Sequence, residues 1–351
     1  MINYSKFKNK KILITGHSGF KGSWLSFIFY LFGSKVYGIS DKYEKKSLFS
    51  NLNLINKTKT YLVNINDHKS FSKIINYVKP DIIFHLAAES IVSRSYKKPI
   101  ETFKTNIIGT ANVLDSLRYL NHKCTAIIIT SDKCYENKEL TRSYKENDQI
   151  GGSDPYSASK GAAEIIISSM NRSFLKNNKN IKIGICRAGN VIGGGDWSPN
   201  RLIPDLVRSI KSKKTLLIRN PNSTRPWQHV LDPLNGYIIL AYNLYFKKLE
   251  SGLAFNFGPS SLKNHNVKDI LEIVLKICKF NYKTTKNIKI KEASLLSLNS
   301  NKAKKILNWK CKINTKKSII QTIDWYLYYF QNPKQIEQFT KKQIENFFYN
   351  L

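Results

Sequence analysis

Short apolar runs alternate with longer amphipathic stretches through the first half of the chain. The stretches at 70–78 and 105–120 carry apolar residues at helical spacing, and the runs between them are short enough to be buried strands. We expect strands at 11–15, 35–39, 60–64, 81–87, 125–130, 182–188 and, after an irregular stretch, 254–257. This alternation predicts a parallel sheet with helices on both faces, in which ligands bind at the carboxyl ends of the strands.

A glycine-rich turn follows the first predicted strand. Gly16, Gly19 and Gly22 give the spacing GxxGxxG and leave the backbone bare before a helix that we expect to begin at Ser23. Amide groups at a helix N-terminus face outward, and the helix dipole favours the negative charge of a pyrophosphate. The turn therefore predicts a dinucleotide site, although the pattern alone is also typical of glycines that merely end a strand.

The predicted fold class is α/β, a Rossmann-type doubly wound parallel sheet with a smaller C-terminal substrate-binding α/β region. We assign the dinucleotide-binding domain to 1–187, with a returning segment at about 230–260. From about residue 188 the order is less regular and richer in Pro, Asn and Trp, which favours a substrate region at 188–229 and 261–330. The segment 331–351 is predicted to be a polar, partly amphipathic helix that braces the surface.

Composition sets the broad class. The chain has 351 residues, 42% of them hydrophobic, which is ordinary for a globular protein with a large core. The longest apolar run, 24–32, is too short to span a membrane, and nothing before the first strand resembles a signal peptide. We therefore expect a cytoplasmic protein without a membrane partner. Five cysteines show no metal or disulfide spacing, which predicts free thiols and no metal site.

The net charge of +33 has three interpretations. Lys, Asn and Ile are all frequent, as AT-rich coding produces, and this is the interpretation we prefer. A basic protein also attracts anionic ligands such as nucleotides, or binds nucleic acid or an anionic membrane surface. The lysines are scattered and form no basic stripe interleaved with aromatic residues, so we expect no nucleic-acid partner.

Tyr156 and Lys160 lie four residues apart, just after a turn that ends in Pro155. Proline suits the first turn of a helix, and the spacing puts both side chains on one helical face. A nearby ammonium favours the phenolate, so we expect Lys160 to lower the pKa of Tyr156 and let it take a proton from a sugar hydroxyl. The spacing alone occurs often by chance, and the glycine turn upstream is what favours the catalytic interpretation.

Polar and small residues follow other predicted strands. Ser131, Asp132 and Lys133 place a hydroxyl, a carboxyl group and an amine at a strand end, where they either face the cleft or simply cap the strand. The small residues within 85–88 let a cofactor lie against the backbone, or merely pack. Asp41 lies where an acidic side chain holds a ribose hydroxyl of NAD, whereas the lysines after it would suit NADP, so NAD is only preferred.

Two loops carry candidate binding residues. The loop at 193–197 combines three glycines with Trp, and the loop at 225–229 combines Arg, Trp and His. The planar guanidinium of Arg225 can pair with a diphosphate, and an aromatic side chain can stack on a base. Loop packing with surface charge is the alternative.

Taken together, these segments resemble the extended short-chain dehydrogenase/reductase family and, within it, the CDP-glucose 4,6-dehydratases. The resemblance rests on 15–25, 84–88, 131–137, 154–160, 187–197 and 224–230, in family order and ending near 304–309. The glycine turn and the Tyr–Lys spacing are common to the superfamily, whereas Asp-Lys-Cys-Tyr-Glu-Asn and Arg-Pro-Trp-Gln-His-Val are narrower. Lys133 stands where the related dTDP-glucose dehydratases have glutamate, which favours the CDP-sugar branch. Ser131, Asn64 and Glu89 stand where threonine, aspartate and glutamine are usual.

The resemblance implies a dehydration in which the cofactor starts and ends as NAD. Tyr156, activated by Lys160, removes the O4 proton of the sugar while hydride passes from C4 to NAD, and Ser131 hydrogen-bonds O4. Lys133 then removes the C5 proton and Asp132 protonates the departing C6 hydroxyl. Hydride returns to C6 and C5 is reprotonated, so that the net redox change is zero.

The resemblance also implies the binding residues and partners. Those for NAD are Gly16, His17, Gly19, Phe20, Gly22, Asp41, Asn64, Ile65, Leu86, Ala87, Tyr156 and Lys160. Those for the substrate, CDP-glucose, are Asn190, Arg201, Arg225 and His229. Helices near 103–120 and 157–172 resemble those that pair family members, which implies a homodimer or a dimer of dimers. The product would feed the sugars of a surface polysaccharide.

Two other functions remain open from the sequence. One is another nucleotide-sugar dehydratase, or a 4-epimerase, on the same scaffold, although an epimerase would not need Asp132 and Lys133. The remote alternative is a non-catalytic NAD- or nucleic-acid-binding protein, which the basic charge suggests. Such a protein would need neither that pair nor Tyr156 with Lys160.

Overall fold

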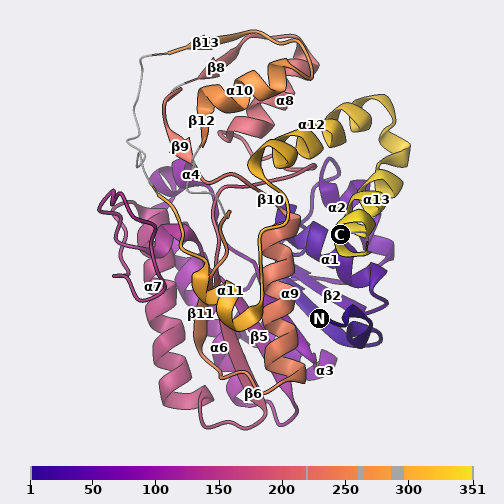
Figure 1. Ribbon diagram of the computed structural model, residues 1–351. Coiled ribbons are helices and arrows are strands. Elements are labelled where there is room, and N and C mark those ends of the chain that lie inside the picture. Colours follow the sequence, from indigo (N-terminus) through magenta and orange to yellow (C-terminus); the bar gives the residue numbers. More distant parts are fainter. Residues whose placement is uncertain (1, 219, 260–264, 286–295, 350–351) are drawn as a thin grey trace.

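The computed structural model describes residues 2–218, 220–259, 265–285 and 296–349. Within them, a seven-stranded sheet has the strand order β11-β6-β5-β4-β1-β2-β3, and all of its pairs are parallel (Figure 1). The strands are β1 Lys11–Thr15, β2 Lys35–Ser40, β3 Lys59–Leu62, β4 Ile82–His85, β5 Cys124–Ile129, β6 Ile181–Arg187 and β11 Leu253–Asn256. The predicted fold class is confirmed, including the late strand that returns to the sheet beside β6.

The order in which the chain adds strands to the sheet reverses between β1 and β4, and the candidate site lies at this point. The chain runs from β1 outward to β3, then crosses back to β4 and continues to β6. The register pairs Thr15 with His85 and Ile129 with Cys186, so the loops after these strands open at one edge. Ligands of doubly wound folds bind in the crevice at such a reversal.

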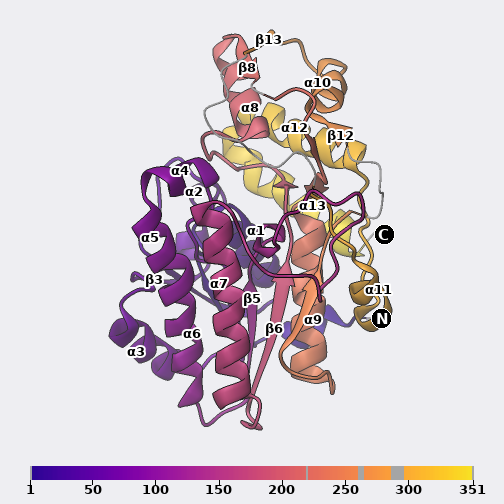
Figure 2. The same cartoon turned by 90° about the vertical axis from the view of Figure 1, so that its left-hand side faces the viewer.

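Helices cover both faces of the sheet because the central strands are apolar on both sides. Leu13, Ala126 and Ile128 face one core with helices α3 His68–Val78, α6 Gly109–Arg118 and α7 Pro155–Met170. Ile12, Ile14 and Ile127 face the opposite core with α1 Phe20–Leu31 and α9 Leu231–Phe246. Figure 2 shows α3, α5, α6 and α7 on the near face of the sheet.

A second region lies beyond the carboxyl ends of the strands, at the top of Figure 1. Among the described residues it contains three two-stranded sheets, β7–β10, β8–β13 and β9–β12. Its helices and strands are β7 Val191–Ile192, α8 Leu202–Ser212, β8 Leu216–Ile218, β9 Thr224–Arg225, β10 Gln228–His229, β12 His265–Asn266, α10 Val267–Leu275, β13 Tyr282–Thr284 and α12 Thr315–Gln331. Where this region should be divided from the dinucleotide domain stays a prediction.

The remaining elements are short, apart from the last helix. They are η1 Tyr4–Phe7, α2 Leu48–Asn51, η2 Leu54–Asn56, α4 Val92–Lys97, α5 Pro99–Phe103, η3 Lys104–Ile108, η4 Asp132–Cys134, η5 Asn171–Leu175, α11 Asn301–Leu307, η6 Pro333–Gln335 and α13 Ile336–Tyr349. The predicted terminal helix is thus present. Trp325 on α12 donates to Thr340 Oγ1 at 2.8 Å, and Phe348 meets the ring of Tyr4 edge-on at 5.1 Å, so α13 joins α12 to the N-terminal segment. Of the helices that the structure describes, none has the length and apolar character to cross a bilayer.

Candidate active site

The glycine turn is a tight cradle against the end of β4. Gly16 has a φ of +69°, and a Cβ there would lie 2.8 Å from the backbone of Ala87. A Cβ at Gly22 would overlap the carbonyl oxygen of Gly16. The helix α1 begins at Phe20, not at Ser23 as predicted, because Gly19 serves as its N-cap and Gly22 fits inside the first turn. The bare backbone and the outward amides of this helix fit a pyrophosphate.

His17 joins this turn to the neighbouring strands. Its Nδ1 lies 2.9 Å from Ser40 Oγ and its Nε2 lies 3.0 Å from Thr60 Oγ1, and the ring is fully buried edge-on to Phe49. Burial lowers its pKa to about 4, so the imidazole is neutral near pH 7. In this arrangement His17 fixes the turn, and its contact with a cofactor stays a prediction.

Other residues predicted for the cofactor follow the carboxyl ends of β2, β3 and β4. Asp41 and Asn64 are exposed, while Ile65 is buried beside them. Leu86 and Ala87 are half-buried, and the Ala87 amide donates to Thr15 Oγ1 at 3.2 Å. The sheet brings all of these to one edge with the glycine turn, and their individual roles stay predictions.

The turn after β5 holds a buried carboxyl group. Ser131 caps the short helix η4, accepting from the Lys133 amide at 3.2 Å and donating its hydroxyl to Asp132 Oδ1 at 2.9 Å. Asp132 is only 2% exposed, and its Oδ2 has no hydrogen-bond partner in the described part of the chain. A buried polar oxygen without a partner is costly to maintain, which makes Oδ2 a candidate for a ligand contact.

Tyr156 and Lys160 lie on the first turns of α7, which packs against η4. Asp154 caps this helix by accepting from the Ser157 amide at 3.0 Å, and Pro155 follows it. Burial raises the pKa of Tyr156 to about 12, against a smaller lowering from a hydrogen bond with Ser131. Burial also lowers the pKa of Lys160 to about 8, with the charge of Lys21 adding to the effect.

The expected lowering of the pKa of Tyr156 by Lys160 is therefore wrong for the protein alone. Both groups are buried, and desolvation penalises the charged form of each. The phenol is held neutral and the ammonium is made easier to deprotonate.

A buried ion pair that the sequence analysis missed ties these elements together. Glu164 accepts from Arg187 Nε and Nη2, each at 2.9 Å, and from Thr130 Oγ1 at 2.6 Å. Both charged side chains are about 5% exposed or less. The pair locks α7 to the ends of β5 and β6. Glu164 lies one helical turn beyond Lys160, so continuing the Tyr156–Lys160 spacing would have found it.

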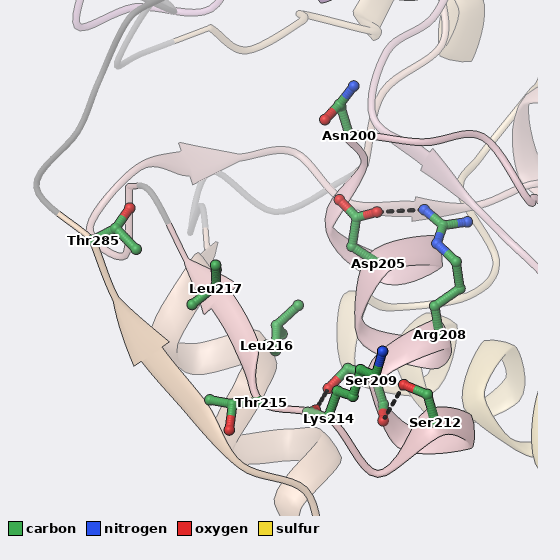
Figure 3. A pocket seen from close by; sticks show the side chains of 10 residues that line it. All are labelled: Asn200, Asp205, Arg208, Ser209, Ser212, Lys214, Thr215, Leu216, Leu217 and Thr285. Carbon is green, nitrogen blue, oxygen red and sulfur yellow. Dashed lines mark hydrogen bonds and ion pairs between the residues drawn. The ribbon is translucent and has the colours of Figure 1, made fainter.

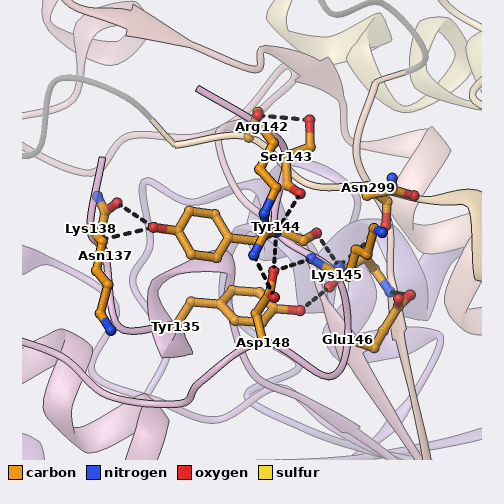
Figure 4. Close-up of polar contacts among 12 residues, drawn as sticks. Tyr135, Asn137, Lys138, Arg142, Ser143, Tyr144, Lys145, Glu146, Asp148 and Asn299 are labelled. Carbon is orange, nitrogen blue, oxygen red and sulfur yellow. Dashed lines mark hydrogen bonds and ion pairs between the residues drawn. The ribbon is translucent and has the colours of Figure 1, made fainter. Parts of the chain in front are cut away.

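The segment that follows η4 contains two stacked tyrosines (Figure 4). The rings of Tyr135 and Tyr144 lie 5.2 Å apart, and Tyr135 donates to Asn256 Oδ1 at 2.7 Å. The Tyr144 hydroxyl accepts from the Lys138 amide at 2.8 Å, and its carbonyl accepts from the Asn299 amide at 2.8 Å. These contacts anchor the loop that carries the catalytic turn to β11 and to the C-terminal region.

The residues predicted for the substrate all follow β6 in the chain and come from several elements. Arg201 pairs with Asp196 at 2.9 Å, and its charge acts on both Tyr156 and Lys21, so it lies near the predicted catalytic residues. Asn190, with a φ of +49°, follows β6 at the same edge. The remaining two residues, Arg225 and His229, lie on β9 and β10.

Arg225 and His229 differ in burial. Arg225 is half-buried on β9 and donates to the Thr224 carbonyl at 2.8 Å. His229 is fully buried beside the Trp24 ring, and burial lowers its pKa to about 3. Its Nδ1 accepts from the Leu231 amide at 3.4 Å, whereas Nε2 has no partner among residues 2–218, 220–259, 265–285 and 296–349. Their contacts with a substrate stay predictions.

An open cavity of about 440 Å³ lies in the C-terminal region, between α8 and the β8–β13 pair (Figure 3). Its lining residues are Asn200, Asp205, Arg208, Ser209, Ser212, Lys214, Thr215, Leu216, Leu217 and Thr285. One of its lining residues, Asn200, directly precedes Arg201 in the chain, and none of the predicted catalytic residues lines it.

A parallel doubly wound sheet with a glycine cradle and a buried Tyr–Lys pair at its reversal point defines a short-chain dehydrogenase/reductase type of enzyme. Residues 13–322 match the model of the GDP-mannose 4,6 dehydratase family, and the chain belongs to that family.

Relatives of known name agree with this assignment. The chain is 38% identical over 336 residues to the CDP-glucose 4,6-dehydratase of Salmonella typhimurium, which covers 93% of each chain. Among solved structures, the UDP-glucose 4-epimerase of Thermotoga maritima with UDP-glucose superposes with a TM-score of 0.78 at 20% identity, covering 92% of this chain and all of that one. The dTDP-glucose 4,6-dehydratase of Bacillus anthracis, in complex with NAD, gives 0.73 at 21% identity and covers 92% and 97%. These two structures share the fold.

Proposed function

We propose that the protein is a CDP-glucose 4,6-dehydratase, an NAD-dependent hydro-lyase that converts CDP-D-glucose to CDP-4-dehydro-6-deoxy-D-glucose and water. The observation that carries the proposal is the 38% identity to the Salmonella enzyme of that name over nearly the whole of both chains. The site supports it independently, because Asp132 and Lys133 lie beside the Tyr156–Lys160 pair. A 4-epimerase would need only the second pair.

NAD fits the cradle between β1 and β4. The pyrophosphate would lie on the glycine turn of Gly16, Gly19 and Gly22, against the start of α1, and Asp41 would hold a ribose hydroxyl. When bound, NAD supplies the acceptance and return of hydride that a redox-neutral dehydration requires.

The buried pair on α7 carries out the proton chemistry at O4. Tyr156 takes the proton of the O4 hydroxyl, and the Ser131 hydroxyl hydrogen-bonds O4. Lys160 lies on the same helical face as Tyr156, and in the ligand-bound protein its ammonium would favour the phenolate. The burial of both side chains keeps water away from this exchange.

Asp132 and Lys133 carry out the elimination. The C4 keto group acidifies the C5 proton, which the Lys133 amine removes, while Asp132 gives its proton to the departing C6 hydroxyl. The unpartnered Oδ2 of Asp132 is the atom suited to that transfer, because Oδ1 already accepts from Ser131.

The test is to incubate the purified protein and NAD separately with CDP-glucose, dTDP-glucose and UDP-glucose, and to follow the loss of water by mass spectrometry. Water loss only from CDP-glucose supports the proposal. Loss from another nucleotide sugar keeps the chemistry and replaces the substrate. A change at C4 without water loss favours an epimerase, and no turnover with NAD bound favours a binding protein.

We further propose a homodimer formed through α6 and α7, which lie side by side with α5 on one face (Figure 2). Large apolar side chains are exposed on these helices or directly beside them in the chain: Ile100 74%, Ile108 49%, Tyr119 68%, Ile165 63% and Phe174 47%. Exposed apolar side chains gathered on neighbouring elements are typical of protein interfaces. From the family resemblance we also assign the reaction to the cytoplasm and to the synthesis of surface polysaccharide sugars.

Light scattering of the protein and of Ile165→Glu tests the homodimer. We expect the native chain to be dimeric and the variant to be monomeric at micromolar concentration. Tyr77→Glu, at an equally exposed site on α3, is the control and should leave the assembly unchanged. A native monomer, or equal behaviour of the two variants, would contradict the proposal.

A further inference from the structure

Gly189 lies against the carboxyl group of Asp132. It follows the end of β6 by two residues, and a Cβ at this position would overlap Cγ, Oδ1 and Oδ2 of Asp132. The carboxyl group therefore fills the space that a side chain at position 189 would occupy. On its other side, the same carboxyl group accepts the Ser131 hydroxyl at 2.9 Å.

Position 189 needs glycine because of the space that Asp132 occupies, and not because of its backbone conformation. The glycines with a positive φ in the described residues are Gly16, Gly33, Gly195 and Gly252, so Gly189 has a conformation open to any residue. What excludes a larger residue there is the space already taken by Asp132.

The backbone around each partner is held in place by its neighbours. The Gly189 carbonyl accepts from Gln228 Nε2 at 3.2 Å, and the same amide donates to the Phe257 carbonyl at 2.8 Å. Gln228 is fully buried on β10. On the facing side, Asp132 sits in the short helix η4, which Ser131 caps and α7 covers.

We propose that Gly189 is a positioning residue for the dehydration step. Its missing side chain forms a slot that holds the Asp132 carboxyl group in one orientation, with Oδ1 on Ser131 and Oδ2 left for the substrate. The inference rests on the proposed function, in which Asp132 protonates the C6 hydroxyl. It assigns to Gly189 no part in the O4 chemistry, because Tyr156 and Lys160 are held on α7.

If the slot positions Asp132, changing Gly189 should slow the loss of water and leave the oxidation at C4 nearly unchanged. In Gly189→Ala the methyl group must displace the Asp132 carboxyl, and a misplacement of about 1 Å costs on the order of 10²-fold in rate. We expect the rate of water loss from CDP-glucose to fall about 10²-fold. The reduction of NAD in a single turnover, which reports the C4 step, should change less than about threefold.

A double-mutant cycle shows whether the effect passes through Asp132. Added to Asp132→Ala, the Gly189→Ala substitution should have almost no further effect on the rate of water loss or on the melting temperature, because the clash is gone. Gly184→Ala, on β6, is the matched control: its Cβ would lie 2.8 Å from side-chain atoms of Leu240 and Leu244 in the core. It should lower the melting temperature equally with and without Asp132→Ala.

Two results would overturn the inference: an equal loss of both half-reactions in Gly189→Ala, or effects of the two substitutions that simply add. Should Gly189→Ala fail to fold, its rescue by Asp132→Ala supports the contact, and no rescue overturns it. The melting-temperature cycle needs no substrate. If the native protein does not dehydrate CDP-glucose, the proposed function fails, while a non-additive thermal cycle still demonstrates the slot.

Discussion

The two sides of the catalytic edge differ in how their buried polar atoms are satisfied. On the α7 side, Glu164, Arg187 and Thr130 form a closed network in which the polar atoms find partners within the protein. On the side formed by η4, α9 and β10, four buried atoms have no partner among the described residues: Asp132 Oδ2, Gln228 Oε1, His229 Nε2 and the Tyr237 hydroxyl oxygen. Asp132 and Tyr156 both interact electrostatically with Tyr237, so the two sides adjoin.

This difference separates the scaffold from the binding surface. A closed buried network keeps its geometry because opening it leaves uncompensated charge. An open one is maintained at a cost to stability, and a ligand that supplies the missing partners recovers that cost. Under the proposed function, we therefore expect the α7 side to position the reacting groups and the α9–β10 side to contact the ligand.

Glu164→Ala should break the closed side. Removing the carboxylate leaves Arg187 charged and buried, and we expect the free energy of unfolding to fall by about 3–5 kcal/mol, with activity lost as α7 loosens. Chemical denaturation measures this. Glu337→Ala is the control, because Glu337 is 40% exposed in its ion pair with Lys57 and should contribute less than about 1 kcal/mol. Equal losses in the two variants would contradict the comparison.

On the side with unpartnered atoms, Asp132→Asn should lower the rate of dehydration without lowering the free energy of unfolding. A general acid contributes on the order of 10²–10⁴-fold, so we expect the rate of water loss to fall by that factor. The free energy of unfolding should stay the same or rise, since a buried carboxyl oxygen without a partner is replaced by a neutral amide. Rate and denaturation measurements on the same preparation test both halves. A variant that dehydrates at the native rate would remove Asp132 from the mechanism.

The fold was largely predictable from local sequence, whereas the closed network of Glu164, Arg187 and Thr130 was not identified from it. Strand lengths and helical spacing depend on neighbouring residues, and the expected strands lie within a few residues of the observed ones. The start of α1 was placed too late, because glycine at position 22 was taken as a turn residue, although its contact with Gly16 allows the helix to pass through it. The stretch 105–120 was expected as one helix, but its first turns are π-helical.

The open side was not predictable in the same way. The pKa of Tyr156 depends on burial by distant elements, and the contact of Gly189 with Asp132 joins the ends of two strands that carry no shared local pattern. Motif positions identified which residues to examine, including Asp132, Lys133, Tyr156 and Lys160. Only packing in three dimensions shows which of their atoms lack a partner.

The burial of Lys160 makes the free energy of unfolding depend on pH. Burial lowers its pKa to about 8, below that of an unfolded lysine, so between these values the unfolded chain binds more protons than the folded one. Stability from this group is reduced below pH 8 and recovers as the pH rises toward the unfolded pKa, by at most about 1.4 kcal/mol per pH unit. The difference in unfolding free energy between the native protein and Lys160→Met, measured from pH 7 to 10, should shrink with rising pH. A constant difference would contradict the lowered pKa.

Thr130→Val tests the closed network with its smallest element. Valine keeps the shape of threonine and removes only the hydroxyl that donates to Glu164 at 2.6 Å, while the two bonds from Arg187 remain. One such hydrogen bond to a charged acceptor contributes about 1.5–3 kcal/mol, and the carboxylate keeps other partners, so we expect a loss near the lower figure. Thr130→Ser should restore most of it. Because Thr130 directly precedes Ser131 and Asp132, a closed scaffold predicts that the valine variant slows the C4 step and water loss by the same factor. A loss confined to water elimination would instead place Thr130 with the open side and move the boundary between the two.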